Sequence, residues 1–190
     1  GMYNIKGYIT DADFSVFNEI DLGIKTTDSV NFNAHYVAAN DGKIYAVAMI
    51  TDYGDFELPD YNDPDFDYEN FDYEAMEEAA TYTYKIFTIS ESGEILTESE
   101  ISGIEKFSDA DDSSGIVYLQ DCFALGSSKI CLALSGGINS DYITVDSDGS
   151  ISEPIDFGTD DYFHPYGTDR DNNFVYMTNK GSDNILKTLD

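Results

Sequence analysis

The chain is poor in several residue types that common functions require. Its 190 residues include no tryptophan, two histidines, two cysteines and nine lysines and arginines, against 38 aspartates and glutamates. The resulting formal charge of −29 repels phosphate backbones and anionic lipid, so we expect no nucleic-acid partner. The acidity leaves three interpretations open: a solvated surface, bound cations or a basic partner.

Long apolar runs are also missing. No stretch approaches the roughly 18 apolar residues of a membrane span, and the N-terminus lacks the basic and apolar regions of a signal peptide. Gly1 before Met2 is typical of a remnant of tag removal, so the sequence leaves open whether the native protein has a leader peptide. An apolar content of 42% suits a globular core, so we expect a soluble single domain over 1–190.

Helical periodicity is nearly absent, and short apolar runs separated by Gly, Asn, Asp and Ser clusters indicate β-strands. The predicted strands are Tyr3–Thr10, Ser15–Ile20, Phe32–Ala38, Lys43–Ile50, Thr81–Ser90, Ile95–Ile101, Ile116–Leu125, Lys129–Leu134, Tyr142–Asp146, Ser150–Ile155, Phe163–Thr168, Phe174–Thr178 and Ile185–Thr188. The fold class is therefore predicted to be all-β.

One sequence motif recurs along the chain. Three segments share this motif: GYITDADFSVFNEIDLG, YKIFTISESGEILTESEISG and DYITVDSDGSISEPIDFG. A fourth copy starts with NILKTLD at the C-terminus. The threonines that anchor the copies are spaced by 78, 56 and 44 residues, and they are Thr10, Thr88, Thr144 and Thr188. A recurring motif predicts a repeat architecture, and we take 44 residues as the length of a repeat without insertions.

A unit of this length with four strands in a meander resembles a β-propeller blade, and the VDSDGSI turn is similar to hairpins of bacterial propeller repeats of the NHL and related kinds. The resemblance implies about three four-stranded antiparallel blades, half of a propeller, in a surface or secreted protein. Such an arc exposes strand edges and blade faces. We therefore expect a homo-oligomer or part of a larger ring, completed by a second copy or by sequence outside this stretch.

Residues 51–80 form an acidic aromatic insertion with twelve aspartates and glutamates and seven aromatic residues. A connection this long is usually functional or disordered, and its aromatic content disfavours disorder. We take Tyr61, Phe66 and Tyr68 as candidate binding residues. Five carboxylates stand where positions 1, 3, 5, 7 and 12 of an EF-hand loop supply oxygens to calcium: Asp63, Asp65, Asp67, Glu69 and Glu74.

Calcium is the one cofactor that this pattern suggests, and a solvated run of charge is the alternative. Tyr68 occupies the sixth position, where the sharp turn of an EF-hand calls for glycine. A second acidic stretch, Asp109–Asp112, resembles the Asp-Ala-Asp-Asp segment of β-propeller phytases, whose acidic residues help to hold catalytic calcium. The Pro-Ala that follows in that family and a basic phosphate site are both missing, so an acidic turn is the alternative.

The two histidines, His35 and His164, fall at equivalent places in their repeats, near the first strand, which lines the central channel of a propeller. Imidazoles there are candidate binding residues, metal ligands or a general base, and a structural role is the alternative. No nucleophile motif accompanies them. We therefore assign no catalytic residue.

The two cysteines, Cys122 and Cys131, lie in one predicted hairpin. A turn at Gly126-Ser127 would place them opposite each other in a non-hydrogen-bonded pair, whereas a turn at Ser127-Ser128 would make them diagonal neighbours too distant for a disulfide. Buried free thiols are favoured over a bridge, because cysteine is among the residues most often buried.

The expected function is therefore a non-catalytic binding module whose ligand is an unknown protein or carbohydrate. Two alternatives stay open. The first is a calcium-dependent, phytase-like hydrolase, which would need a basic anion site that nine cationic residues can barely provide. The second is a structural segment of a larger propeller.

Overall fold

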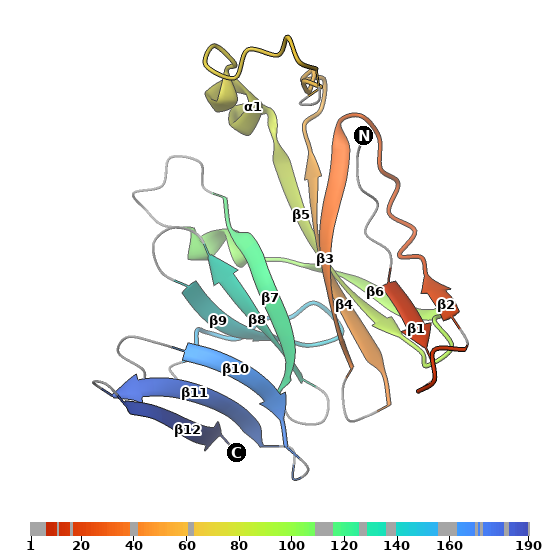
Figure 1. Ribbon diagram of the computed structural model, residues 1–190, viewed down its shortest axis with the longest axis vertical. Coiled ribbons are helices and arrows are strands. Elements are labelled where there is room, and N and C mark those ends of the chain that lie inside the picture. Colours follow the sequence, from red (N-terminus) through yellow and green to blue (C-terminus); the bar gives the residue numbers. More distant parts are fainter. Residues whose placement is uncertain are drawn as a thin grey trace.

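The chain folds into four antiparallel sheets that follow one another along the sequence (Figure 1). The computed structural model describes all residues except 1–6, 11, 16, 39–41, 61–62, 109–115, 126–128, 136–139, 156–162, 170, 172, 181–182 and 190. The first sheet contains β1 (Gly7–Thr10) and β2 (Phe17–Ile20). The second contains β3 (Val30–Ala38), β4 (Ile44–Asp52), β5 (Thr81–Ile89) and β6 (Ile95–Ile101).

The third sheet contains β7 (Tyr118–Leu125), β8 (Lys129–Ser135) and β9 (Ser140–Val145). The fourth contains β10 (Phe163–Thr168), β11 (Phe174–Lys180) and β12 (Asp183–Leu189). Helix within the described residues is limited to α1 (Tyr73–Ala79) and the 3-10 turn η1 (Ile104–Phe107). The all-β prediction is confirmed. The described parts of the sheets have two to four strands, and they form neither a closed sheet nor a closed ring.

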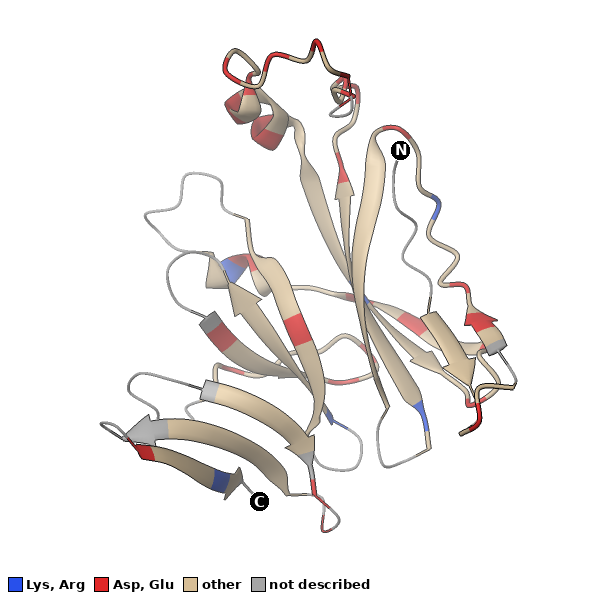
Figure 2. Cartoon of the chain, in the orientation of Figure 1, with Lys and Arg blue, Asp and Glu red and all other residues tan. Residues whose placement is uncertain are grey.

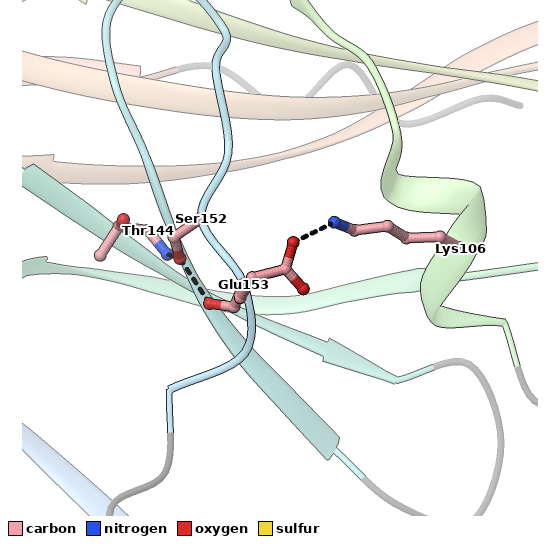
Figure 3. Close-up of polar contacts among 4 residues, drawn as sticks. All are labelled: Lys106, Thr144, Ser152 and Glu153. Carbon is pink, nitrogen blue, oxygen red and sulfur yellow. Dashed lines mark hydrogen bonds and ion pairs between the residues drawn. The ribbon is translucent and has the colours of Figure 1, made fainter.

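The predicted strands match the observed ones closely, with one correction. Ser150–Ile155 is not a regular strand, because only an isolated bridge joins Ile151 to Val145. The hydroxyl of Ser152 accepts the hydrogen bond of the Thr144 backbone N–H at 3.0 Å, in the place where a ladder would use a carbonyl (Figure 3). A serine side chain that competes for backbone groups in this way interrupts regular pairing.

The repeat threonines occupy equivalent strands. Thr88, Thr144 and Thr188 lie on the third strands of the second, third and fourth sheets. Thr10 ends β1. The sequence period therefore corresponds to a structural unit, in which a meander of strands forms one sheet.

The core lies between successive sheets. Along β4, alternate side chains point to opposite faces, so that Val47 packs toward the third sheet whereas Ala46 and Ala48 pack toward the first. Between the third and fourth sheets, Phe123 stacks on Phe174 with ring centroids 5.4 Å apart. Each fully buried large apolar side chain contributes roughly 1.5–3 kcal/mol, so these contacts between sheets hold the fold together.

The exposed ion pair at the junction of the second and third sheets adds little stability. Lys106 on η1 reaches the carboxylate of Glu153 at 3.5 Å, and both side chains are largely exposed (Figure 3). Such a pair contributes about 0–1 kcal/mol. The turn at Gly149 lies close to the backbone of Glu100, because a Cβ added to Gly149 would overlap the Glu100 carbonyl oxygen. Apolar burial and close backbone packing, rather than surface charge, therefore hold this junction.

Neither predicted turn for the cysteine hairpin is correct. Leu125 pairs with Lys129, which places Phe123 opposite Cys131 and Cys122 opposite Leu132. A shift of one residue moves a side chain to the other face of a sheet. Cys122 therefore packs between the second and third sheets and Cys131 between the third and fourth, and both thiols are free. Burial raises the pKa of Cys122 and raises that of Cys131 to about 12.

The acidic aromatic insertion joins β4 to β5, as the sequence predicts, and projects beyond the ends of these strands (Figure 1). Figure 2 shows its acidic residues gathered away from the other sheets. The insertion contains helix α1, whose N-terminus is capped by the Asp72 carboxylate, which accepts a hydrogen bond from the Ala75 N–H at 2.9 Å. No helix in the described part of the chain has the length and apolarity needed to cross a membrane.

Candidate functional site

The aromatic residues of the insertion contact one another. Phe66 lies edge-on to Tyr68 and to Phe71, with centroids 4.6 Å and 5.4 Å away, and Phe71 lies 4.8 Å from Tyr73. Edge-to-face pairs of this kind give the segment its own small cluster. Tyr61, the third predicted binding residue here, lies outside the described residues.

Two of the five proposed calcium ligands, Asp63 and Asp67, accept hydrogen bonds from neighbouring residues. The Asp63 carboxylate accepts the Asp65 N–H at 2.9 Å, and that of Asp67 accepts the Glu69 N–H at 3.1 Å and the Asn70 amide at 2.7 Å. The Asn70 hydrogen bond is the main cause that lowers the pKa of Asp67. Glu74 lies in the first turn of α1.

No three His, Cys, Asp or Glu side chains among the described residues gather closely enough to hold a metal ion. The calcium site therefore stays a prediction. The phytase-like stretch Asp109–Asp112 lies outside the described residues.

The first strands of the second, third and fourth sheets, β3, β7 and β10, lie side by side. His35 on β3 meets Asp121 on β7, with 3.4 Å between Nδ1 and Oδ1. Next to this pair is a pocket of about 280 Å³, lined by Val37, Ala38, Asp121, Cys122, Phe123, Ala124, Pro165, Tyr166 and Gly167. The fold thus brings one predicted histidine to a shared surface of three sheets.

The second histidine is not brought to this pair. His164 lies on β10 and contacts the ring of Tyr166 edge-on, with centroids 5.0 Å apart. His35 and His164 do occupy the same ladder position. Each belongs to the fourth residue pair counted from its hairpin turn, where His35 pairs with Val47 and His164 pairs with Met177. The two histidines therefore occupy equivalent ladder positions on different sheets.

A larger pocket, of about 480 Å³, lies at the base of the insertion. We call it the tyrosine pocket, and its lining residues are Ala80, Thr81, Tyr82, Thr83, Tyr84, Glu100, Ile101, Ser102, Gly103, Glu105 and Val117. The Tyr84 hydroxyl donates a hydrogen bond to the carbonyl of Val117, which ties β5 to the start of the third sheet. This bond gives the pocket one fixed wall.

The electrostatics of the tyrosine pocket favour neutral phenols. Burial, followed by repulsion from Tyr118, Tyr53 and Glu77, raises the pKa of Tyr82 to about 12. Burial also raises the pKa of Tyr84 to about 12. Both hydroxyls therefore keep their protons at physiological pH. Among the described residues, the pocket lining includes two glutamates and no lysine, arginine or histidine.

Sequence reasoning missed this pocket, although one signal was present. Tyr82 and Tyr84 are spaced by two residues directly after the insertion, and residues i and i+2 of a strand share a face. Glu105 and Val117 are contributed by segments distant in sequence, so the pairing of sheets was needed to bring them together.

Comparisons of the chain with protein-family models, curated proteins and solved structures found no match.

Proposed function

We propose that this protein is a non-catalytic binding module, built as an arc of propeller-type blades, and that the tyrosine pocket is its ligand site. The side-by-side arrangement of β3, β7 and β10 supports the arc, because the first strands of successive blades adjoin around a propeller axis. The observation that carries the function is the pocket of about 480 Å³ lined by tyrosines and glutamates.

A carbohydrate is the ligand class that this lining fits best. A pocket within about 300–1,000 Å³ suits a small molecule. Anionic ligands are disfavoured because the lining has no cationic residue and the chain carries a charge of −29. Sugar hydroxyls are matched by the carboxylate acceptors of Glu100 and Glu105, by the donor of Tyr82 and by aromatic ring surface.

The proposal is tested by screening the protein on an array of neutral glycans and by titration calorimetry with each glycan that binds. Tyr82→Phe removes one hydroxyl and keeps the ring, so we expect about 3–10-fold weaker binding, the value of one hydrogen bond. Tyr68→Phe, on the insertion but outside the lining, is the matched control and should bind as wild type.

Glu105→Gln should weaken binding by a similar factor, with Glu94→Gln, which lies in the turn between β5 and β6, as its control. An array without binding, or glycan binding that Tyr82→Phe and Glu105→Gln leave unchanged, would contradict the assignment to this pocket.

A further inference from the structure

A row of side chains on the second sheet is covered by the third sheet. The row crosses three strands, since Val47 on β4 pairs with His35 on β3 and with Ile86 on β5. Val47 and Ile86 are 0% exposed and pack in the cluster between these sheets. Covering this face removes large aliphatic side chains from water, which is the main source of stability at the junction.

The fourth sheet carries the matching row. Met177 on β11 pairs with His164 on β10 and with Leu186 on β12, in the same ladder position. Leu186 is 65% exposed. Tyr166, whose hydroxyl lies 3.8 Å from the Met177 sulfur, is 59% exposed. The two rows are equivalent in register, but among the residues that the structure describes only the second-sheet row is covered.

This face of the fourth sheet is also uncharged. Alternation along β11 and β12 places Val175, Asn184 and Thr188 on the same side as Met177 and Leu186. The described residues of this face include no Asp, Glu, Lys or Arg, in a chain with 38 acidic residues. Figure 2 shows no charged residue along β10. We call the face with His164, Tyr166, Met177 and Leu186 the open face.

The opposite end of the molecule has a partly exposed sheet as well. Ile9 and Ile20 of the first sheet pack against the second sheet. Tyr8, between Gly7 and Ile9 on β1, points to the other side and is 53% exposed. Its pair on β2, Glu19, lies on the same side and is exposed. The first and fourth sheets lie at the two ends of the arc (Figure 1). One end therefore exposes Tyr8, and the other exposes Tyr166 and Leu186.

We propose that a second copy of this chain covers the open face with the Tyr8 side of its own first sheet, and that the reciprocal contact forms at the same time, so that two copies close a head-to-tail ring. The contact continues the packing seen inside the chain, where each sheet covers the face of the one before it. A basic partner does not fit the open face, because its described residues carry no acid. The inference is independent of the tyrosine pocket, which lies on other sheets.

Salt dependence distinguishes this contact from an ionic one. Each copy carries a charge of −29, so long-range repulsion opposes association. The Debye length falls from about 14 Å at 0.05 M to about 4 Å at 0.5 M salt. Higher salt should therefore strengthen an apolar contact between two acidic copies, and it would weaken a contact between opposite charges.

Sedimentation equilibrium of this chain from about 10 to 500 μM, at both salt concentrations, tests the proposal. We expect a mass of twice 21.1 kDa at the upper concentrations, and at least about 5-fold tighter association at high salt. Leu186→Glu should give the monomer mass throughout. Leu96→Glu is the matched control, because Leu96 on β6 is 52% exposed and lies outside the open face, and it should associate as wild type.

Tyr8→Glu tests the identity of the occupant. It should give a monomer, and mixing it with Leu186→Glu should restore a dimer through the one contact whose two surfaces are intact. A dimer that survives Tyr8→Glu but not Leu186→Glu would mean that two open faces meet each other, which overturns the head-to-tail arrangement. A wild-type monomer at every concentration and salt would overturn the proposal itself. Melting curves of each variant check that the fold is kept.

Discussion

The second and fourth sheets each carry a row of side chains at equivalent ladder positions, yet the row on the second sheet is covered and the row on the fourth is exposed. Ile86 and Leu186 are the third-strand members of the two rows. Ile86 is covered by β7–β9, whereas no part of the described chain covers Leu186. The comparison shows that the neighbouring sheet, and not the strand's own sequence, decides which large aliphatic residue stabilises this fold.

The largest expected effect is the difference in stability between two single variants, Ile86→Ala and Leu186→Ala. Ile86→Ala should lower the free energy of unfolding by about 3–4 kcal/mol, because it leaves a cavity in a filled core. Leu186→Ala should lower it by less than about 0.5 kcal/mol when measured on the monomer. Urea denaturation at low protein concentration gives both values. Equal losses would show that the fourth sheet is covered in solution even in the monomer.

A smaller effect is expected from a pair of glycines, one at the junction and one on the fourth sheet. Gly149 has φ +85°, and an added Cβ would meet the Glu100 carbonyl; Gly167 has φ +105° with no atom within 4 Å. Gly149→Ala should cost about 2–4 kcal/mol, from backbone strain and overlap together. Gly167→Ala should cost about 1–2 kcal/mol, from strain alone. Thermal unfolding of both variants separates the two contributions, and equal costs would contradict the close approach at Gly149.

The smallest effect is an alkaline loss of stability at the junction. Tyr82 and Tyr84 have pKa values raised from 10.0 to about 12 by burial. Between these values the unfolded chain releases protons that the native state keeps, so stability falls as pH rises from 10 to 12 and is fully present below pH 10. Melting temperatures by circular dichroism should decline over this window. Tyr84→Phe should flatten the decline, and an unchanged decline would show that other groups cause it.

Much of the fold was predictable from local patterns. Alternating apolar runs placed nearly every strand, because a half-buried strand needs one apolar face. The repeat threonines marked equivalent third strands. The prediction failed at Ser150–Ile155, where a serine hydroxyl takes the place of a backbone acceptor, and at the cysteine hairpin, where the loop length differs by one residue from both predicted turns.

The candidate site was less predictable. His35 was predicted from the repeat, but its partner Asp121 was not, since the contact joins β3 to β7. The five carboxylates fit a spacing template, yet two of them, Asp63 and Asp67, accept hydrogen bonds from nearby backbone and side-chain groups in short turns. The tyrosine pocket combines the base of the insertion with the end of β6 and the start of the third sheet, and no local pattern could indicate that combination.

The sequence alone determined the strands, their order, the acidic insertion and the equivalence of the repeats, because hydrophobic alternation and turn residues act over a few neighbouring positions. Only the tertiary structure decided which faces are covered, which face each cysteine occupies and where a pocket opens. These outcomes depend on how one sheet packs against the next, and a change of one residue in register reverses them.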